Sequence, residues 1–457
     1  MVSAGRTNEI GALIDGRRLS AEQVGVLVLC SLVVLLDGYD IQTMALAVPS
    51  LVADWNIAPS SFSFALSASV LGMLVGTALL APVGDKIGRR PVLIAAMAVV
   101  GLASIGTAFG TTPAQLAAWR FLTGIGLGMS LPNATALTSE YVPLRSRAFL
   151  ISVMFVSIAL GALIAGFTAP ALIEAFGWRS IFVVGGMLPL VLTVLLFAWI
   201  PESLRLLVAE RPGDPRIGGI LRRFLPGIDA ATLYVRAEDR IEKQSVLALF
   251  GPLFLSRTVL LWCLFALNLF VLFVLISWLP TVLSDAGWSR PQALRGAVMI
   301  QAGGIVGGLA IARLVDRGRA GAALLGGYVL AAAAFALFLA LPATVPGWTA
   351  LLLVVGAGVS GAQAALTALS AIFYPPSLRA TGAGWASCCG RAGAVLAPLA
   401  GGYVLGSLDL APDRQLALLI VPVLLCAVCV MLLPYAWKEG GDARLEEPQE
   451  TTPGITP

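Results

Sequence analysis

Apolar residues fill most of this chain in long runs, and short polar segments separate one run from the next. A helix needs about 20 apolar residues to cross a bilayer, and twelve runs reach that length. We place them at 23–49, 60–82, 91–109, 113–137, 147–171, 178–200, 255–283, 291–314, 321–341, 347–373, 381–406 and 415–437. The pattern predicts an all-α membrane protein with twelve transmembrane helices in two six-helix, pseudo-symmetric halves.

Polar segments divide the chain further. We expect a tail at 1–22, a six-helix bundle at 23–200, a linker with short amphipathic helices at 201–254, a second bundle at 255–437 and a tail at 438–457. Loops on one side carry most of the basic residues: Arg6, Arg17, Arg18, Lys86, Arg89, Arg90, Arg145, Arg147, Arg313, Arg317, Arg319 and Arg379. Loops on the other side carry Arg179, Arg290, Arg295 and Arg414. Because basic loops stay inside, both tails and the linker are expected in the cytoplasm.

The two halves repeat one another at a nearly constant distance. Asp316 follows Asp85 by 316 − 85 = 231 residues, in the segments VDRGRAGA and GDKIGRRP. Arg379 follows Arg147 by 379 − 147 = 232 residues, and TGIGLG aligns with VGAGVSG at the same offset. Duplicated halves are typical of transporters whose central site lies where the halves meet.

Composition agrees with a membrane protein. The chain is 58% hydrophobic and 12% charged, whereas soluble proteins are about 25% charged. A net charge of +4 indicates no nucleic-acid partner. The six cysteines all lie in apolar runs, so we interpret them as buried thiols that form neither a zinc site nor a disulfide framework. No metal site, phosphate-binding loop or nucleophile triad is recognisable, so we predict no enzyme activity and no cofactor.

Two carboxylates interrupt the first apolar run, in the segment LLDGYDIQTM. Asp37 and Asp40 are the acids that lie deep in a predicted span, and each would cost roughly 2.5–3.5 kcal/mol at the bilayer centre. Positions i and i+3 share a helix face, so both can point into one cavity. With no histidine in the chain, carboxylates are the expected proton carriers. Alternatively, the two acids are a structural pair that Arg120 neutralises.

Two deep arginines complement the acids. Arg120 lies in the fourth run, and Arg391 lies in the eleventh, roughly 15 Å from its cytoplasmic start. The repeat places Leu352 opposite Arg120 and Ala159 opposite Arg391, so the charges are not duplicated. We therefore expect protons to be handled by the first half and an organic anion by Arg391 in the second. A structural Arg391 that binds helix carbonyls is the alternative.

Further candidates are less specific. Glu140, at the cytoplasmic end of the fourth run, is either a proton-exit group or part of an interfacial ion pair. Mid-span amides that suit a carboxylate or a ring hydroxyl are Asn268 and Gln301. Aromatic residues that suit a ring are Tyr39, Phe265, Phe270, Phe373 and Trp385, and each of them equally suits lipid or the core.

The loop GDKIGRRP at 84–91 resembles the signature of the major facilitator superfamily between its second and third helices. That resemblance covers the chain from end to end and implies a conformational latch. The latch residues would be Gly84, Asp85, Gly88, Arg89, Arg90 and Arg147, with Asp316 and Arg379 as second-half counterparts. The second-half segment DRGRAGA lacks the full pattern, which predicts a weaker latch there.

Three motifs are similar to those of the aromatic acid:proton symporter family, which imports 4-hydroxybenzoate, protocatechuate and benzoate. They are DGYD, the segment from Trp119 to Arg147, and RATGAGWASCCGRAGAVLAP. The resemblance implies a monomeric, proton-coupled importer of small aromatic acids in the bacterial inner membrane, working by alternating access. A proton-coupled exporter of drugs or metabolites, and a membrane sensor that binds without transport, remain alternatives.

Overall fold

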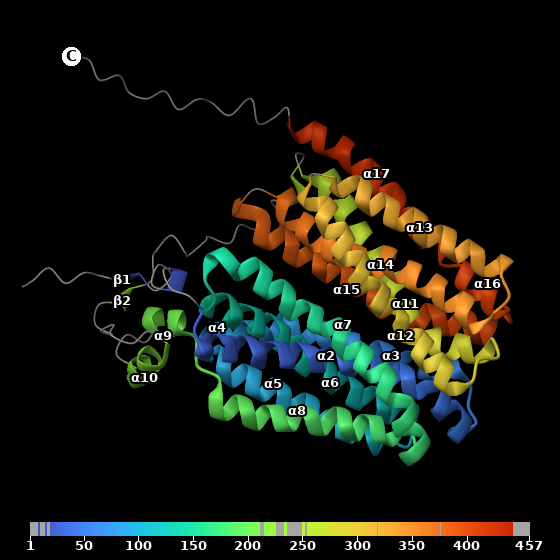
Figure 1. The fold of residues 1–457 in the computed structure, drawn as a ribbon, viewed down its shortest axis with the longest axis horizontal. Coiled ribbons are helices and arrows are strands. Elements are labelled where there is room, and N and C mark those ends of the chain that lie inside the picture. The colour runs from blue at the N-terminus through green and yellow to red at the C-terminus, as the bar shows by residue number, and fades with distance from the viewer. Residues whose placement is uncertain are drawn as a thin grey trace, which may run out of the picture.

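The computed structural model describes residues 8–9, 14–15, 19–210, 214–224, 233–234, 249–251, 254–317, 319–374 and 376–441. Long antiparallel helices account for most of them (Figure 1). The N-terminal half holds α2 (Ala21–Trp55), α3 (Ser63–Val75), α5 (Arg89–Ala108), α6 (Pro113–Tyr141), α7 (Leu144–Phe176) and α8 (Arg179–Trp199). The C-terminal half holds α11 (Leu255–Asp285), α12 (Arg290–Asp316), α13 (Ala320–Ala340), α14 (Val345–Phe373), α15 (Pro376–Ser407), α16 (Pro412–Ala417) and α17 (Ile420–Gly441).

Eleven of the described helical segments are long and apolar enough to cross a membrane. Helix α6 is the exception among the twelve long helices, because it carries Arg120, Asn133 and several hydroxyl residues. Its 29 residues still span about 43 Å at 1.5 Å per residue. The chain is a multi-pass membrane protein, and the predicted fold class is confirmed.

The linker elements lie at one end of the helices (Figure 1). Helix α9 (Leu204–Glu210) and helix α10 (Pro215–Phe224) gather there, and β1 (Asn8–Glu9) pairs in parallel with β2 (Leu233–Tyr234). Phe224 packs on Tyr141 with 4.8 Å between ring centroids, and Arg223 forms an ion pair with Glu22. We call this end the linker side and the opposite end the far side.

Local irregularities separate the structure from the expected spans. After α3 the chain continues as a π-helix (Gly76–Leu80), a 3₁₀ helix (Ala81–Val83) and α4 (Gly84–Ile87), while a short 3₁₀ helix (Pro59–Phe62) precedes α3. The expected limits of tails and linker stay a prediction, and many of their residues lie outside the described ranges. Cys30 and Cys426 are buried, and three further cysteines are partly buried. Cys263 is exposed on the helix surface, so the prediction that all cysteines are buried is wrong for that residue. A small apolar thiol suits a lipid-facing surface as well as a core.

Glycines allow α2 and α7 to lie backbone to backbone. A Cβ at Gly38 would overlap the backbone of Ile158, and one at Gly161 would overlap the backbone of Leu35. Small residues bring membrane helices close together, where van der Waals contact stabilises them. This contact fixes the stretch of α2 that carries Asp37 and Asp40.

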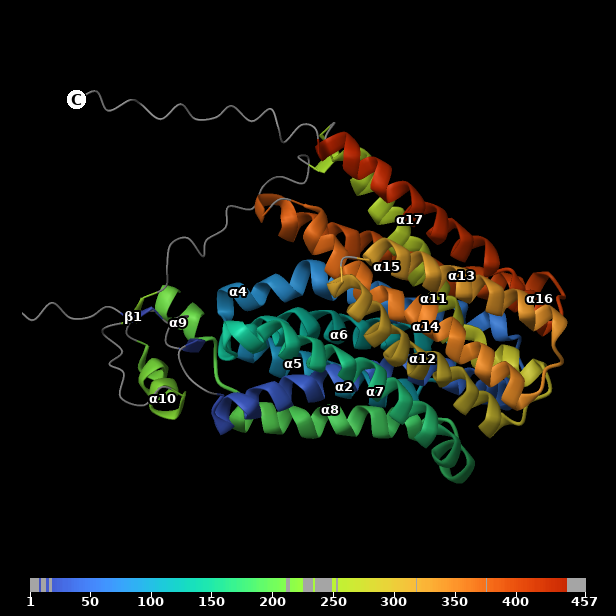
Figure 2. The same ribbon diagram turned by 45° about the horizontal axis from the view of Figure 1, so that its top comes forward.

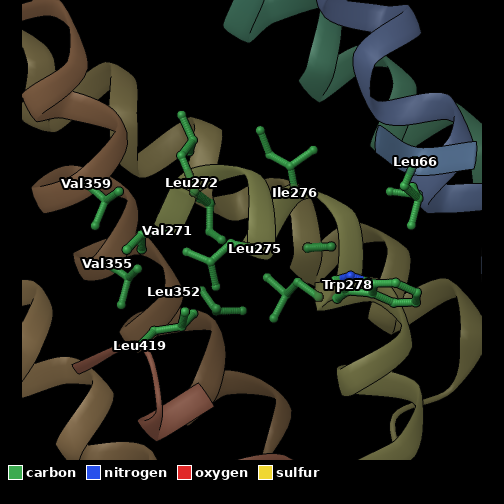
Figure 3. Packing of buried hydrophobic residues seen from close by; sticks show 14 of the residues in the cluster. Leu66, Val271, Leu272, Leu275, Ile276, Trp278, Leu352, Val355, Val359 and Leu419 are labelled. Carbon is green, nitrogen blue, oxygen red and sulfur yellow. The ribbon is translucent and has the colours of Figure 1, made fainter. Parts of the chain in front are cut away.

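The two halves touch each other toward the far side. Ser67 of α3 donates a hydrogen bond of 2.9 Å to the carbonyl oxygen of Val395 in α15, and a Cβ at Gly402 would meet Ser63. One buried apolar cluster runs through both halves at this level and includes Leu66 of α3 together with Trp278 of α11 (Figure 3). A view turned by 45° shows the same stacking of the two halves, with the linker elements at one end (Figure 2). The far side is therefore closed by direct packing.

Candidate functional site

Asp40 and Arg120 form a buried ion pair between α2 and α6. Arg120 Nη1 donates to Asp40 Oδ1 at 2.9 Å, and Nη2 donates to Oδ2 at 2.6 Å. Nη2 also lies 3.1 Å from the Asp40 carbonyl oxygen and 3.4 Å from Ser69 Oγ. Both side chains are 1% exposed. Two parallel charge-assisted hydrogen bonds hold a carboxylate firmly, so this geometry describes an ionised Asp40.

Asp37 has a different environment, although it lies less than one turn away. Its side chain is 3% exposed, and its hydrogen-bond partner is the Ser130 hydroxyl, 2.9 Å from Oδ2 and 3.2 Å from Oδ1. Ser130 Oγ also lies 2.8 Å from the carbonyl oxygen of Leu127. A hydroxyl has one proton to donate. A protonated Asp37 that donates to Ser130, which in turn donates to Leu127, satisfies all three groups.

The Asp40–Arg120 pair lies next to the surface where the halves meet. A small cavity of about 20 Å³ is lined by Arg120 and Ser69 from the N-terminal half and by Ser277 and Ile276 from α11. The volume suits about one water molecule. Separation of the halves at this level would expose the arginine.

Arg391 occupies the middle of α15, 15 residues after the helix begins at Pro376. Val395, Gly402 and Gly406 of the same helix meet α3 and the 3₁₀ helix before it. Four residues separate Arg391 from Val395, so the two side chains share a face, and Arg391 continues the contact face toward the linker side. Among the described residues, no ion pair or hydrogen bond involves Arg391.

The predicted amides belong to networks in the C-terminal half. Asn268 is fully buried; it donates to Gln363 Oε1 at 2.8 Å and accepts from the Tyr328 hydroxyl at 2.9 Å. Gln301 accepts a hydrogen bond of 3.2 Å from Ser360. Both networks converge on α14, which carries Gln363 and Ser360. The side-chain oxygens of Asn268, Gln301 and Gln363 all accept hydrogen bonds from protein groups, and the amide nitrogen of Asn268 is engaged as a donor as well.

The predicted aromatic residues lie in different environments. Phe265 is 2% exposed and packs against Gly390 of α15. Trp385 stacks on Trp262 with 6.0 Å between ring centroids. Tyr39 is 2% exposed and packs within the N-terminal half, against Gly185 of α8.

Phe270 is partly buried against the core, and the side chain of Phe373 lies outside the described residues. The structure therefore places Phe265 on the same helix pair as Arg391, and it places Tyr39 in the other half.

Glu140 lies with the latch residues and not with the two deep acids. It forms an ion pair with Arg89 and accepts a hydrogen bond of 2.5 Å from Ser203 Oγ. Arg89 also lies 3.5 Å from Asp85. Of the two readings of Glu140, the geometry matches the interfacial ion pair, which joins α6 to the start of α5.

Glu202 organises the latch from the segment after α8. Its Oε1 accepts hydrogen bonds from the backbone N–H of Arg89 at 2.8 Å and of Arg90 at 3.2 Å. A carboxylate at these free amides is stabilised by the helix dipole. Gly88 has φ +120° and leaves no room for a Cβ beside Glu202. Only glycine adopts this conformation without strain.

The remaining latch candidates are placed as follows. A Cβ at Gly84 would overlap the side chain of Asn133 in α6. Arg90 Nη2 donates to the Phe197 carbonyl oxygen at 2.6 Å, near the end of α8. Arg147 lies in the first turn of α7. The side chains of Asp316 and Arg379 lie outside the described residues, so the second-half latch stays a prediction.

Sequence reasoning missed several groups that the geometry brings forward. Ser130 and Gln363 are neutral residues in apolar helices, where a hydroxyl or amide gives no pattern of its own. Glu202 stands in the polar stretch PES after a span, and its acidic character there was the available signal. The partners of a buried carboxylate become visible only when two distant helices are placed side by side.

Comparisons with known proteins agree with this architecture. The model of the Major Facilitator Superfamily matches residues 30–398. The chain belongs to the major facilitator superfamily. Members that resemble it include a 4-hydroxybenzoate transporter, PcaK, of Acinetobacter baylyi, 36% identical over 92% of this chain and 93% of that protein. A gallate transporter of Pseudomonas putida is 35% identical over 97% and 96%. Family and relatives identify this superfamily member as a transporter and not an enzyme.

Solved structures show the same superfamily fold. The inward-open xylose transporter XylE from E. coli superposes with a TM-score of 0.70 at 19% identity, covering 91% of this chain and 96% of that one. The predicted membership of the superfamily is confirmed by the family match over residues 30–398.

Proposed function

We propose that this protein is a symporter that carries small aromatic carboxylic acids into the cell together with protons. Relatives named for 4-hydroxybenzoate, gallate and benzoate support the substrate class. The proposal places the linker side in the cytoplasm of a bacterium, with the chain in its inner membrane and working as a monomer. The closed far side then faces outward.

One observation carries the substrate assignment. The N-terminal half neutralises its own deep charges, because Asp40 pairs with Arg120, whereas Arg391 in the C-terminal half has no ion-pair partner among the described residues. An uncompensated cation at mid-membrane is costly. A ligand carboxylate would compensate the charge and take two parallel hydrogen bonds from the guanidinium.

The different partners of Asp37 and Asp40 support the choice of Asp37 as the proton carrier. Asp40 is held ionised by Arg120, so it suits a fixed role that keeps the arginine in place. Asp37 lacks a cation and has a hydrogen-bond arrangement that is complete when the carboxyl is protonated. In our proposal Asp37 carries one proton per cycle and releases it when the linker side is open.

The test compares an acid with its neutral analogue at Arg391. Purified wild type should bind 4-hydroxybenzoate. Arg391→Lys should bind it about tenfold more weakly, because a lysine ammonium cannot donate the two parallel hydrogen bonds of a guanidinium. Arg391→Ala should bind it more weakly still. Binding of 4-hydroxybenzamide should not change between the three proteins. Equal losses for acid and amide would show that Arg391 is structural and would remove the anion assignment.

A further inference from the structure

A second cavity lies on the far side, away from the central residues. It has a volume of about 420 Å³ and is lined by Ser50, Ala53, Asp54, Ile173, Phe176, Gly177, Trp178, Arg179 and Arg290. Ligand sites for small molecules start at roughly 300 Å³. The lining combines apolar residues with three charged groups, Asp54, Arg179 and Arg290, and all three are exposed, so the cavity is open to the medium.

The charges of this far-side cavity favour an anion. Asp54 accepts a hydrogen bond of 3.1 Å from Trp178 Nε1 and lies 4.0 Å from Arg179. Arg179 in turn covers the Trp178 ring at 4.4 Å. Arg290 has no ion pair or hydrogen bond among the described residues. Two guanidinium groups therefore face one carboxylate, and the excess positive charge belongs to Arg290.

The aromatic wall adds a second preference. Phe176 is 76% exposed, whereas Trp178 is 4% exposed and its ring lies beneath the guanidinium of Arg179. The ring of a ligand can stack on Phe176 or on the outer face of the Arg179 guanidinium, while its carboxylate reaches Arg290. A small aromatic carboxylate matches both features, whereas an inorganic anion would use only the charge.

Residues of both halves build the far-side cavity. Arg290 begins α12 in the C-terminal half, while the other lining residues come from α2, α7, α8 and the turn that joins α7 to α8. The two halves meet close by, where Gly166 of α7 faces the side chain of Val298 in α12. Separation of α7 from α12 would move Arg290 away from the rest of the lining, so the complete site exists while the far side is closed.

We propose that the far-side cavity is a second, regulatory binding site for small aromatic carboxylates. The proposal rests on the proposed function for the nature of its ligand. A ligand that binds one conformation better than another shifts the population toward it. Aromatic acid in this cavity would hold the far side closed and slow the return to the state that accepts substrate. Uptake should therefore be inhibited by excess external substrate.

The experiment titrates the full-length protein in lipid nanodiscs with 4-hydroxybenzoate by calorimetry. Wild type should show two binding sites for each chain. Arg290→Gln should weaken the second site about tenfold, since a charged hydrogen-bonding partner is lost, and should leave the central site intact. Arg391→Ala should lose the central site and retain the second site. Arg414→Gln, which removes another exposed far-side arginine, is the matched control and should resemble wild type.

A second experiment measures the initial rate of uptake as a function of external substrate concentration. Initial rates in wild type should rise and then fall as external 4-hydroxybenzoate increases, while Arg290→Gln should reach a plateau. One binding site in wild type, or the same two sites and the same inhibition in Arg290→Gln, would overturn the regulatory site and leave the proposed function standing. Loss of binding in Arg290→Gln with none in Arg391→Ala would support the far-side site and contradict the proposed function.

Discussion

Replacing Asp37 by asparagine tests the proton assignment most specifically. An asparagine side chain is the same size and can still donate to Ser130 Oγ, so it imitates a carboxyl that never releases its proton. We expect Asp37→Asn to bind 4-hydroxybenzoate and to exchange it across the membrane at nearly the wild-type rate. It should not accumulate the acid against a gradient, because no proton travels with the substrate.

The proposed role of Asp37 also predicts how far the wild type should accumulate the acid. One deep carboxyl without a cation partner implies one proton for each substrate anion. A pH difference of one unit is worth about 1.4 kcal/mol, which supports about tenfold accumulation of a singly charged acid. If Asp40 also released a proton, two protons would support about a hundredfold.

The assay uses proteoliposomes with an imposed pH difference and no membrane potential, filled at symmetric substrate concentration. Uphill uptake of labelled 4-hydroxybenzoate is measured at several pH differences, and leak of the neutral acid is subtracted with protein-free vesicles. Asp285→Asn, which changes an exposed carboxylate at the end of α11, should behave as wild type. Uphill uptake by Asp37→Asn at the wild-type level would refute the reasoning, and a hundredfold wild-type limit would refute the fixed role of Asp40.

Three further predictions follow from other contacts. Asp40→Asn should destabilise the protein by about 3–5 kcal/mol, because it leaves Arg120 buried without its partner; a melting temperature equal to wild type would contradict this. Glu202→Gln should slow transport severalfold with unchanged substrate binding, since the charged cap of α5 is weakened; normal initial rates of uptake would show that the cap is dispensable. Gly161→Val should overpack the α2–α7 contact and cost about 1–3 kcal/mol or more, measured by thermal unfolding, whereas Gly25→Val, which has free space around it, should not.

The sequence predicted the helices well because a bilayer imposes a simple rule on composition. Every run of about 20 apolar residues corresponds to helical structure, including the run at 113–137, which became α6 although that helix carries Arg120 and Asn133. The interruptions of the second helix were not predicted. Its π and 3₁₀ turns over 76–83 depend on packing against α6, which leaves no trace in the hydrophobic pattern.

The candidate site was predicted in part. The residues that are costly in a membrane stand out in any sequence, so Asp37, Asp40, Arg120 and Arg391 could be chosen from their type and depth. The sequence could not show which acid pairs with Arg120, because Asp37 and Asp40 lie on one helix face and either could have reached the arginine. The contact of Ser130 with Asp37 depends on how α2 and α6 align along their length.

The sequence also grouped Glu140 with the deep acids as a candidate for proton coupling. In the structure it pairs with Arg89, one residue before the end of α6. Counting residues from the start of a span gives depth to within a turn, but it does not give the neighbours at that depth. Glu202, which comes from outside the spans, shows the same limit.

The central claim is that an aromatic acid and a proton cross the membrane together in the same direction. External pH, recorded as 4-hydroxybenzoate is added to weakly buffered proteoliposomes, tests it most directly. We predict an alkaline shift outside that saturates with substrate, is absent with 4-hydroxybenzamide and is lost in Asp37→Asn. Uptake of the acid without a pH change, or with acidification of the outside medium, would contradict proton symport.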